Sequence, residues 1–81
     1  MPTERKILAA KIDVIGEHAN TLTGGAILDS ADKLQLLAMI RDTADSALAN
    51  AVALARHDGM TWDQVGRWTG TTRQAAQQKY R

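Results

Sequence analysis

Residues 59–81 read GMTWDQVGRWTGTTRQAAQQKYR, the stretch with the densest set of helix-start and helix-end signals in the chain. Thr61 followed three residues later by Gln64 is a capping box, in which each side chain bonds a backbone N–H that the first helical turn leaves unpaired. Gly70 ends this helix, because a sharp turn between two helices needs the positive φ that glycine adopts without strain. The pattern predicts a first short helix over about residues 62–68.

A second short helix follows over about residues 73–80. Either Thr71 or Thr72 caps it, since threonine is favoured at that position. Three residues of this helix can lie toward the protein, namely Ala75, Ala76 and Tyr80. Six polar residues can point away from it: Thr72, Arg73, Gln74, Gln77, Gln78 and Arg81. The sequence therefore predicts two capped helices joined by a glycine turn, the second of them with two unlike faces.

The outward residues carry the hydrogen-bonding groups that recognise nucleic acid. Arginine binds guanine edges and phosphates through two parallel N–H donors, and glutamine matches adenine edges in the same bidentate way. We predict base reading by Arg73, Gln74, Gln77 and Gln78, and phosphate binding by Arg67, Thr72, Lys79 and Arg81. In the simpler interpretation these residues are ordinary parts of a helix surface. A single Arg or Gln at such a position usually is.

This stretch resembles the small helix-turn-helix DNA-binding domains common in actinobacteria and their phages, and more broadly the last DNA-binding region of sigma factors. About the last quarter of the chain carries the resemblance: Thr61-Trp62, Val65-Gly66, Gly70 and Thr72-Arg73-Gln74-Ala75-Ala76. Gly66 matches the position at which the two helices cross closely, and Gly70 matches the turn glycine. The resemblance implies the helix-turn-helix fold and a binding mode in which the second helix enters the major groove of DNA.

The net charge is small, +1 for the 81 residues, but it is unevenly placed. Residues 56–81 carry five Lys or Arg and two Asp, whereas residues 1–55 carry five Lys or Arg and seven Asp or Glu. The basic excess coincides with the predicted reading helix, as expected for a nucleic-acid binder. So few cations permit only a modest number of phosphate contacts, and we expect a monomer to bind DNA weakly.

Two helices are expected upstream. The first is amphipathic and runs from Pro2 to about Asn20, because its apolar residues fall on one face at helical spacing. That face holds Ile7, Leu8, Ile12, Val14, Ile15, Ala19 and Leu22, and the opposite face holds Lys6, Asp13, Glu17 and Asn20. Gly24 and Gly25 break the chain, and Asp29 or Ser30 caps a long helix that reaches about His57 without Pro or Gly.

The apolar arc of the long helix covers close to half of its circumference. It holds Leu34, Leu36, Leu37, Ile40, Ala44, Ala47, Leu48, Ala51, Val52, Leu54 and Ala55, beside a polar face of Gln35, Asp42, Asp45, Ser46 and Asn50. An arc this wide needs more than one packing partner. We expect a homodimer through this helix, unless intramolecular packing covers the whole arc. The protein-interface candidates are Trp68, Leu36, Ile40, Ala44, Ala47 and Ala51.

The sequence as a whole predicts one all-α domain over residues 1–81. Residues 1–57 form a helical hairpin that acts as scaffold and dimerisation element, and residues 59–81 form the helix-turn-helix. The chain has no cysteine, and His18 and His57 are far apart, so neither a metal site nor a cofactor is expected. No apolar run approaches the ~20 residues that span a bilayer, and no signal-peptide pattern is present, which favours a cytoplasmic protein.

No arrangement typical of an enzyme is recognisable. Ser30 and Ser46 lack a spaced His and Asp, and there is no glycine-rich phosphate loop. We therefore expect a non-enzymatic, sequence-selective binder of double-stranded DNA, a small transcriptional regulator. The alternative is a helical interaction module, encoded by a phage or a bacterium, that binds a host regulatory or transcription protein. Trp68 bears on this choice, since a Trp is more often partly buried, whereas an exposed one favours a protein contact.

Overall fold

The computed structural model describes residues 2–25 and 27–81, and these form four helices and no strand. The helices are α1 (Pro2–Thr23), α2 (Ser30–His57), α3 (Trp62–Thr69) and α4 (Arg73–Tyr80). The predicted all-α class is confirmed. None of these helices is long and apolar enough to cross a membrane, as judged over the described part of the chain.

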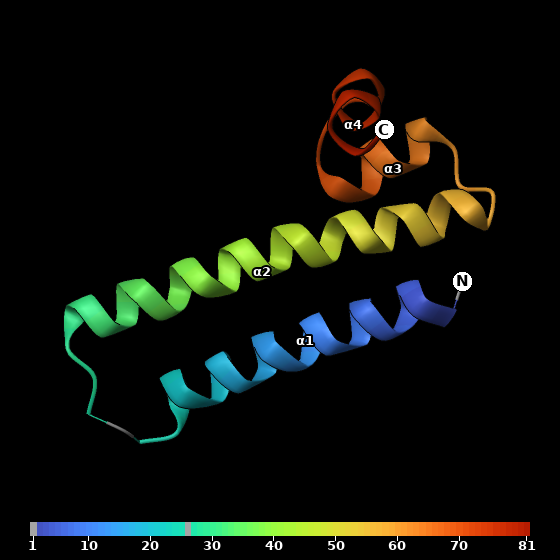
Figure 1. Cartoon of the computed structure of the whole chain (residues 1–81). Coiled ribbons are helices and arrows are strands. Elements are labelled where there is room, and N and C mark those ends of the chain that lie inside the picture. Colours follow the sequence, from blue (N-terminus) through green and yellow to red (C-terminus); the bar gives the residue numbers. More distant parts are fainter. Residues whose placement is uncertain (1, 26) are drawn as a thin grey trace.

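The helices form a flat, elongated molecule (Figure 1). α1 and α2 lie side by side as an antiparallel hairpin, and α3 and α4 sit together on the C-terminal half of α2 (Figure 1). The extents are 45 × 28 × 15 Å, and the radius of gyration is 15.1 Å. A compact chain of this length has a radius of gyration of about 12 Å. The radius of gyration is larger because the N-terminal half of α2 has α1 beside it but nothing from α3 or α4 (Figure 1).

Hydrogen bonds of local side chains set the helix ends. The backbone N–H of Asp32 donates to Asp29 Oδ1 at 2.8 Å, which makes Asp29 the N-cap of α2. At the other end of the loop, α1 continues to Thr23, three residues beyond the predicted end. The hydroxyls of Thr21 and Thr23 donate to the carbonyls four residues earlier, at 3.1 and 3.0 Å. Gly25, with φ of 87°, supplies the turn that follows.

α1 uses a narrower face against α2 than the sequence pattern predicts. Its half-buried residues are Glu4, Leu8, Lys11, Ile15, His18 and Leu22, spaced three and four residues apart. Four residues assigned to the apolar face are exposed, with Ile12 at 55%: Ile7, Ile12, Val14 and Ala19. The prediction of one wide packed face is wrong here, because a single neighbouring helix can cover only one such stripe.

A chain of polar contacts joins α1 to α2. Lys11 Nζ donates to Ser46 Oγ at 2.7 Å and to Asn50 Oδ1, and Asn50 Nδ2 donates to Glu4 Oε2 at 2.8 Å. The sequence pattern assigned Ser46 and Asn50 to the solvent face, which is wrong for the half-buried Asn50. Charge-assisted bonds of this kind between helices favour one register over its neighbours. They also fix which side of α2 faces α1.

The best-buried part of the molecule lies where α2, α3 and α4 meet. Val52, Val65 and Ala76 form the core there, with Val65 only 1% exposed, and Met60, Trp62 and Tyr80 pack around them. In the described part of the hairpin the one further buried apolar residue is Ala47. Packing of α3 and α4 on α2 is thus the structural basis of the candidate site.

Candidate nucleic-acid interface

α3 and α4 are held by the caps and the turn that the sequence predicts. The backbone N–H of Thr61 donates to Gln64 Oε1 at 2.9 Å, and the N–H of Gln64 donates to Thr61 Oγ1 at 3.2 Å, so the capping box is confirmed. Gly70 has φ of 76°, in the left-handed region, as predicted. The N–H of Ala75 donates to Thr72 Oγ1 at 3.1 Å, which makes Thr72 the cap of α4.

α3 and α4 cross at Gly66. A Cβ atom on this residue would lie 2.8 Å from the carbonyl carbon of Thr72 and 2.9 Å from the nitrogen of Arg73, both of them backbone atoms. The Gly66 carbonyl also accepts the N–H of Thr71 at 2.8 Å. Only a glycine lets the start of α4 come this close, so the position of Arg73 depends directly on the missing side chain.

The outer surface of α4 is wide because its packed surface is narrow. Ala76 is fully buried and Tyr80, one turn later, is half-buried. Ala75 is exposed, so its assignment to the packed face is wrong: one residue along a helix turns the side chain by about 100°. Gln77 is half-buried, at the edge of the surface rather than on it. The remaining predicted residues are all exposed: Thr72, Arg73, Gln74, Gln78, Lys79 and Arg81 on α4 or at its ends, and Arg67 on α3.

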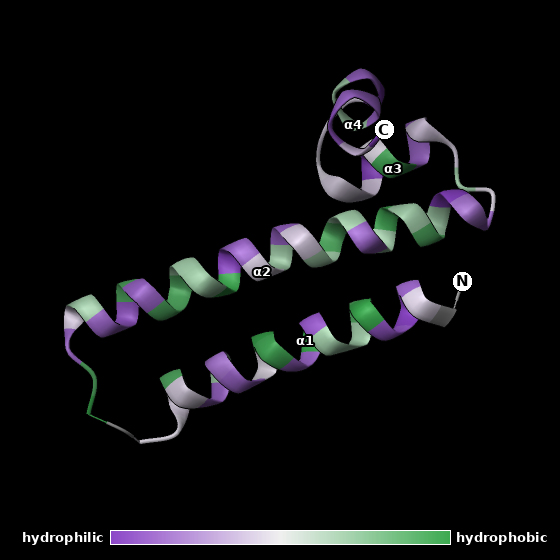
Figure 2. Ribbon diagram, viewed as in Figure 1, coloured by the Kyte–Doolittle hydropathy of each residue, from purple (hydrophilic) through white to green (hydrophobic). Residues whose placement is uncertain are grey.

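This outer surface is polar and without acidic residues. Figure 2 shows α4 mostly in the hydrophilic colour, whereas α2 alternates between hydrophobic and hydrophilic along its length. From Thr71 to Arg81 the sequence has three Lys or Arg and no Asp or Glu. The surface can therefore donate hydrogen bonds to an anionic ligand, and the acidic residue beside it is Asp63 of α3, which lines a pocket together with Arg73.

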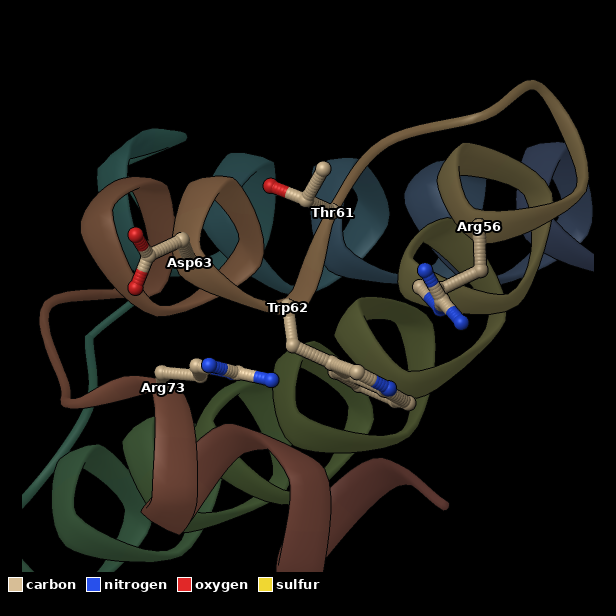
Figure 3. Close-up of a pocket in the computed structure, with 5 residues that line it drawn as sticks. All are labelled: Arg56, Thr61, Trp62, Asp63 and Arg73. Carbon is tan, nitrogen blue, oxygen red and sulfur yellow. The ribbon is translucent and has the colours of Figure 1, made fainter.

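A pocket of about 390 Å³ lies beside this surface, between the ends of α2, α3 and α4. Arg56, Thr61, Trp62, Asp63 and Arg73 line it, and Figure 3 shows the Arg56 and Arg73 side chains approaching Trp62 from α2 and from α4. Arg56 Cζ lies 4.5 Å from the centre of that ring, and Arg56 Nη1 donates to the carbonyl of Met60 at 2.8 Å. Two guanidinium groups that line one opening suit a phosphate, which each can bind bidentately, while the Asp63 carboxylate in the same lining offsets part of their charge.

Sequence reasoning missed Arg56 and Trp62 as site residues. Arg56 reads as a cation that favours the C-terminus of its helix, and Trp62 as the first residue of the next one. The Gly59 turn, with φ of 101°, folds α3 back over α2 and brings the two side chains together. No periodicity within one helix encodes this contact.

The protein-interface candidates separate into two groups. Ala47 is buried and cannot contact a partner protein, so its assignment as an interface residue is wrong. Leu36, Ile40 and Ala51 are half-buried, while Ala44 is exposed. Trp68 is 75% exposed, so the expectation of a partly buried Trp is wrong. It borders a pocket rather than filling one.

Comparison of the chain with protein-family models, curated proteins and solved structures found no match. The resemblance to helix-turn-helix proteins of actinobacteria and their phages stays a prediction. Over the described residues, no group of three or more His, Cys, Asp or Glu side chains is arranged to hold a metal ion.

Proposed function

We propose that the protein binds double-stranded DNA, with α3 and α4 acting as a helix-turn-helix and α4 as the helix that enters the major groove. The observation that carries the proposal is the start of α4. Thr72, Arg73 and Gln74 are exposed there, and the backbone of Thr72 and Arg73 packs closely against Gly66 of α3. Rigid presentation favours base readout, since each bidentate contact needs fixed geometry and contributes about 1–3 kcal/mol of discrimination.

The residues divide into base readers and phosphate contacts. Arg73, Gln74 and Gln78 are the base readers, because they are exposed along the free face of α4. Gln77, at the edge of that face, has a secondary part. Arg67, Thr72, Lys79 and Arg81 bind phosphates, and the pocket adds Arg56 to this set. A small transcriptional regulator, as predicted from the sequence, is the role that sequence-selective binding would serve.

The experiment is a salt titration of duplex DNA binding with matched variants. Arg73→Ala removes one cation from the start of α4, and Lys6→Ala removes one from α1, where it is exposed on a helix that makes no contact with α4. Arg73→Ala is expected to weaken binding and to lower the slope of log K against log salt by about 0.9, the value for one lost phosphate contact. Lys6→Ala is expected to leave both unchanged. Equal effects of the two substitutions would show that only net charge matters and would reject the reading surface.

The second candidate is a module that binds a regulatory or transcription protein, and the exposure of Trp68 favours it. In that case Trp68→Ala abolishes capture of a partner protein and Arg73→Ala does not. Capture that requires Arg73 and DNA, or that returns only the chain itself, counts against this candidate.

A further inference from the structure

Exposed leucines line one side of α2. Leu34, Leu37 and Leu48 are 69, 53 and 36% exposed. Their spacings of three and eleven residues place them on one stripe of a helix with 3.6 residues per turn. Arg41 and Ala44, both exposed, continue the stripe at the same alternation of three and four residues. We call these five residues the α2 stripe.

Neither α1 nor the α3–α4 pair covers this stripe. Asn50, which hydrogen-bonds to α1 residues, is two positions from Leu48 and so points about 200° away around the helix. Val52, buried by α3 and α4, is four positions from Leu48 and only about 40° away, so the stripe continues the face on which α3 and α4 pack toward the N-terminal half of α2, where neither of them lies (Figure 1). Leu48 and Trp68 line a common pocket of about 180 Å³.

The molecule also exposes more surface than its mass requires. A folded monomer of 8.8 kDa has an accessible surface of about 4,800 Å² on average, whereas this chain exposes 5923 Å². The excess, about 1,100 Å², is comparable to the ~800 Å² that each partner buries in a stable interface. An apolar stripe on a chain with this much excess surface is what one half of a dimer presents.

We infer that the α2 stripe is the interface between two copies of this chain, packed with their α2 helices antiparallel about a two-fold axis at Arg41. The stripe is self-complementary about that residue. Leu34 and Leu48 lie seven positions to either side of it, so each faces the other residue in the second copy. Leu37 lies four positions before Arg41 and Ala44 three positions after it, so Leu37 meets Ala44 of the second copy with an offset of one residue, about 1.5 Å. A large side chain then packs beside a small one, which lets the two helices approach closely.

Charges and the pocket fit the same arrangement. Arg41 pairs with Asp42 of its own chain at 3.1 Å, both side chains being largely exposed. Asp42 and Asp45 follow Arg41 by one and four positions, so they lie within about one turn of the axis. Their negative charges offset the positive charges of the two arginines that meet there. The pocket beside Leu48, Ala51 and Trp68 receives Leu34 of the second copy, which accounts for an exposed Trp at this position.

The arrangement has a consequence for DNA that rests on the proposed function. α3 and α4 pack on α2 around Val52, eleven residues from the axis. The two Val52 positions, which mark where the pairs attach, are therefore about 33 Å apart along the seam at a rise of 1.5 Å per residue. Successive major grooves on one face of B-DNA are about 34 Å apart. The dimer thus predicts two half-sites one helical turn apart, whereas the seam itself requires no DNA.

The first test measures association without DNA, by sedimentation equilibrium from about 1 to 200 µM. The wild-type chain is expected to be a dimer in the upper part of this range. Leu37→Glu places a charge on the stripe and is expected to raise the dimer dissociation constant at least about 100-fold. Met39→Glu is the matched control, since Met39 is an exposed residue two positions on, on the far side of α2. A monomeric wild type, or equal effects of the two variants, overturns the inference and leaves the stripe to another protein.

The second test does not depend on a destabilising substitution. The chain has no cysteine, so one introduced thiol is the only reactive site for a short bis-maleimide. Arg41→Cys, at the axis, is expected to give a cross-linked dimer, and Met39→Cys is expected to give almost none. Cross-linking at Met39 but not at Arg41 would place the interface on the opposite side of α2 and reject the seam. Neither test involves DNA, so a failure here is distinct from a failure of the DNA-binding proposal.

Discussion

The close crossing of α3 and α4 predicts opposite signs for the same substitution at two glycines. Gly66 and Gly16 both lie within helices, and in an exposed helix Ala is more favourable than Gly by about 0.8–1.0 kcal/mol. A Cβ atom on Gly16 would meet nothing within 4 Å. Gly16→Ala is therefore expected to stabilise the protein by up to about 1 kcal/mol.

Gly66→Ala meets backbone instead. The new Cβ would lie 2.8 Å from one backbone atom, about 0.6 Å inside the 3.4 Å at which ordinary contact begins, and 2.9 Å from two more. Backbone cannot rotate away as a side chain can, so the start of α4 must move. Overpacking of this kind costs about 1–3 kcal/mol or more, which outweighs the helix-propensity gain. We expect a net loss of about 1–2 kcal/mol, together with weaker DNA binding as Arg73 is displaced.

The assay is thermal and urea unfolding of both variants, followed by circular dichroism. For a domain of this size 1 kcal/mol shifts the melting temperature by about 4–8 °C, so the two variants separate clearly from the wild type and in opposite directions. Protein concentration must be equal in all samples, because dimerisation also shifts the melting temperature. A Gly66→Ala variant as stable as Gly16→Ala would refute the close crossing.

Three further predictions follow from single contacts. Thr72→Ala removes the cap of α4 and is expected to cost about 1 kcal/mol in urea unfolding, whereas Thr71→Ala, which removes no side-chain hydrogen bond of the described structure, is expected to be neutral within about 0.5 kcal/mol. Asn50→Ala breaks the polar contacts between α1 and α2 and is expected to cost about 1–2 kcal/mol by the same measurement, against almost nothing for the exposed Asn20→Ala; equal costs would reject the register role. Arg56→Ala is expected to lower the salt slope of DNA binding by about 0.9, and an unchanged slope would remove the pocket from the interface.

The predictions that succeeded from sequence rest on local interactions. The Thr61–Gln64 capping box and the left-handed Gly70 involve residues at most three positions apart, so their side-chain chemistry is sufficient to place them. The small residue at Gly66 was expected from the family resemblance, and the structure supplies the physical reason for it. Fold class followed in the same way from helical periodicity.

The predictions that failed depend on tertiary pairing. Periodicity gives α1 an apolar arc that includes Ile12, but only the contact with α2 decides which stripe of that arc is covered. The bond between Lys11 and Asn50 joins residues 39 positions apart, and no local pattern marks it. The same holds for Arg56 and Trp62, which meet across a turn, and for Trp68, whose exposure depends on where α3 sits on α2.

The most direct test of the central claim is selection of bound sequences from a random duplex pool at two salt concentrations, with the wild-type protein and Arg73→Ala in parallel. Reading by α4 predicts one enriched motif for the wild type, persisting at the higher salt, with two half-sites related by a dyad and about one helical turn apart. Arg73→Ala is expected to relax the preference at one position of each half-site. A wild-type pool that remains random at both salt concentrations would contradict sequence-selective DNA binding by this surface.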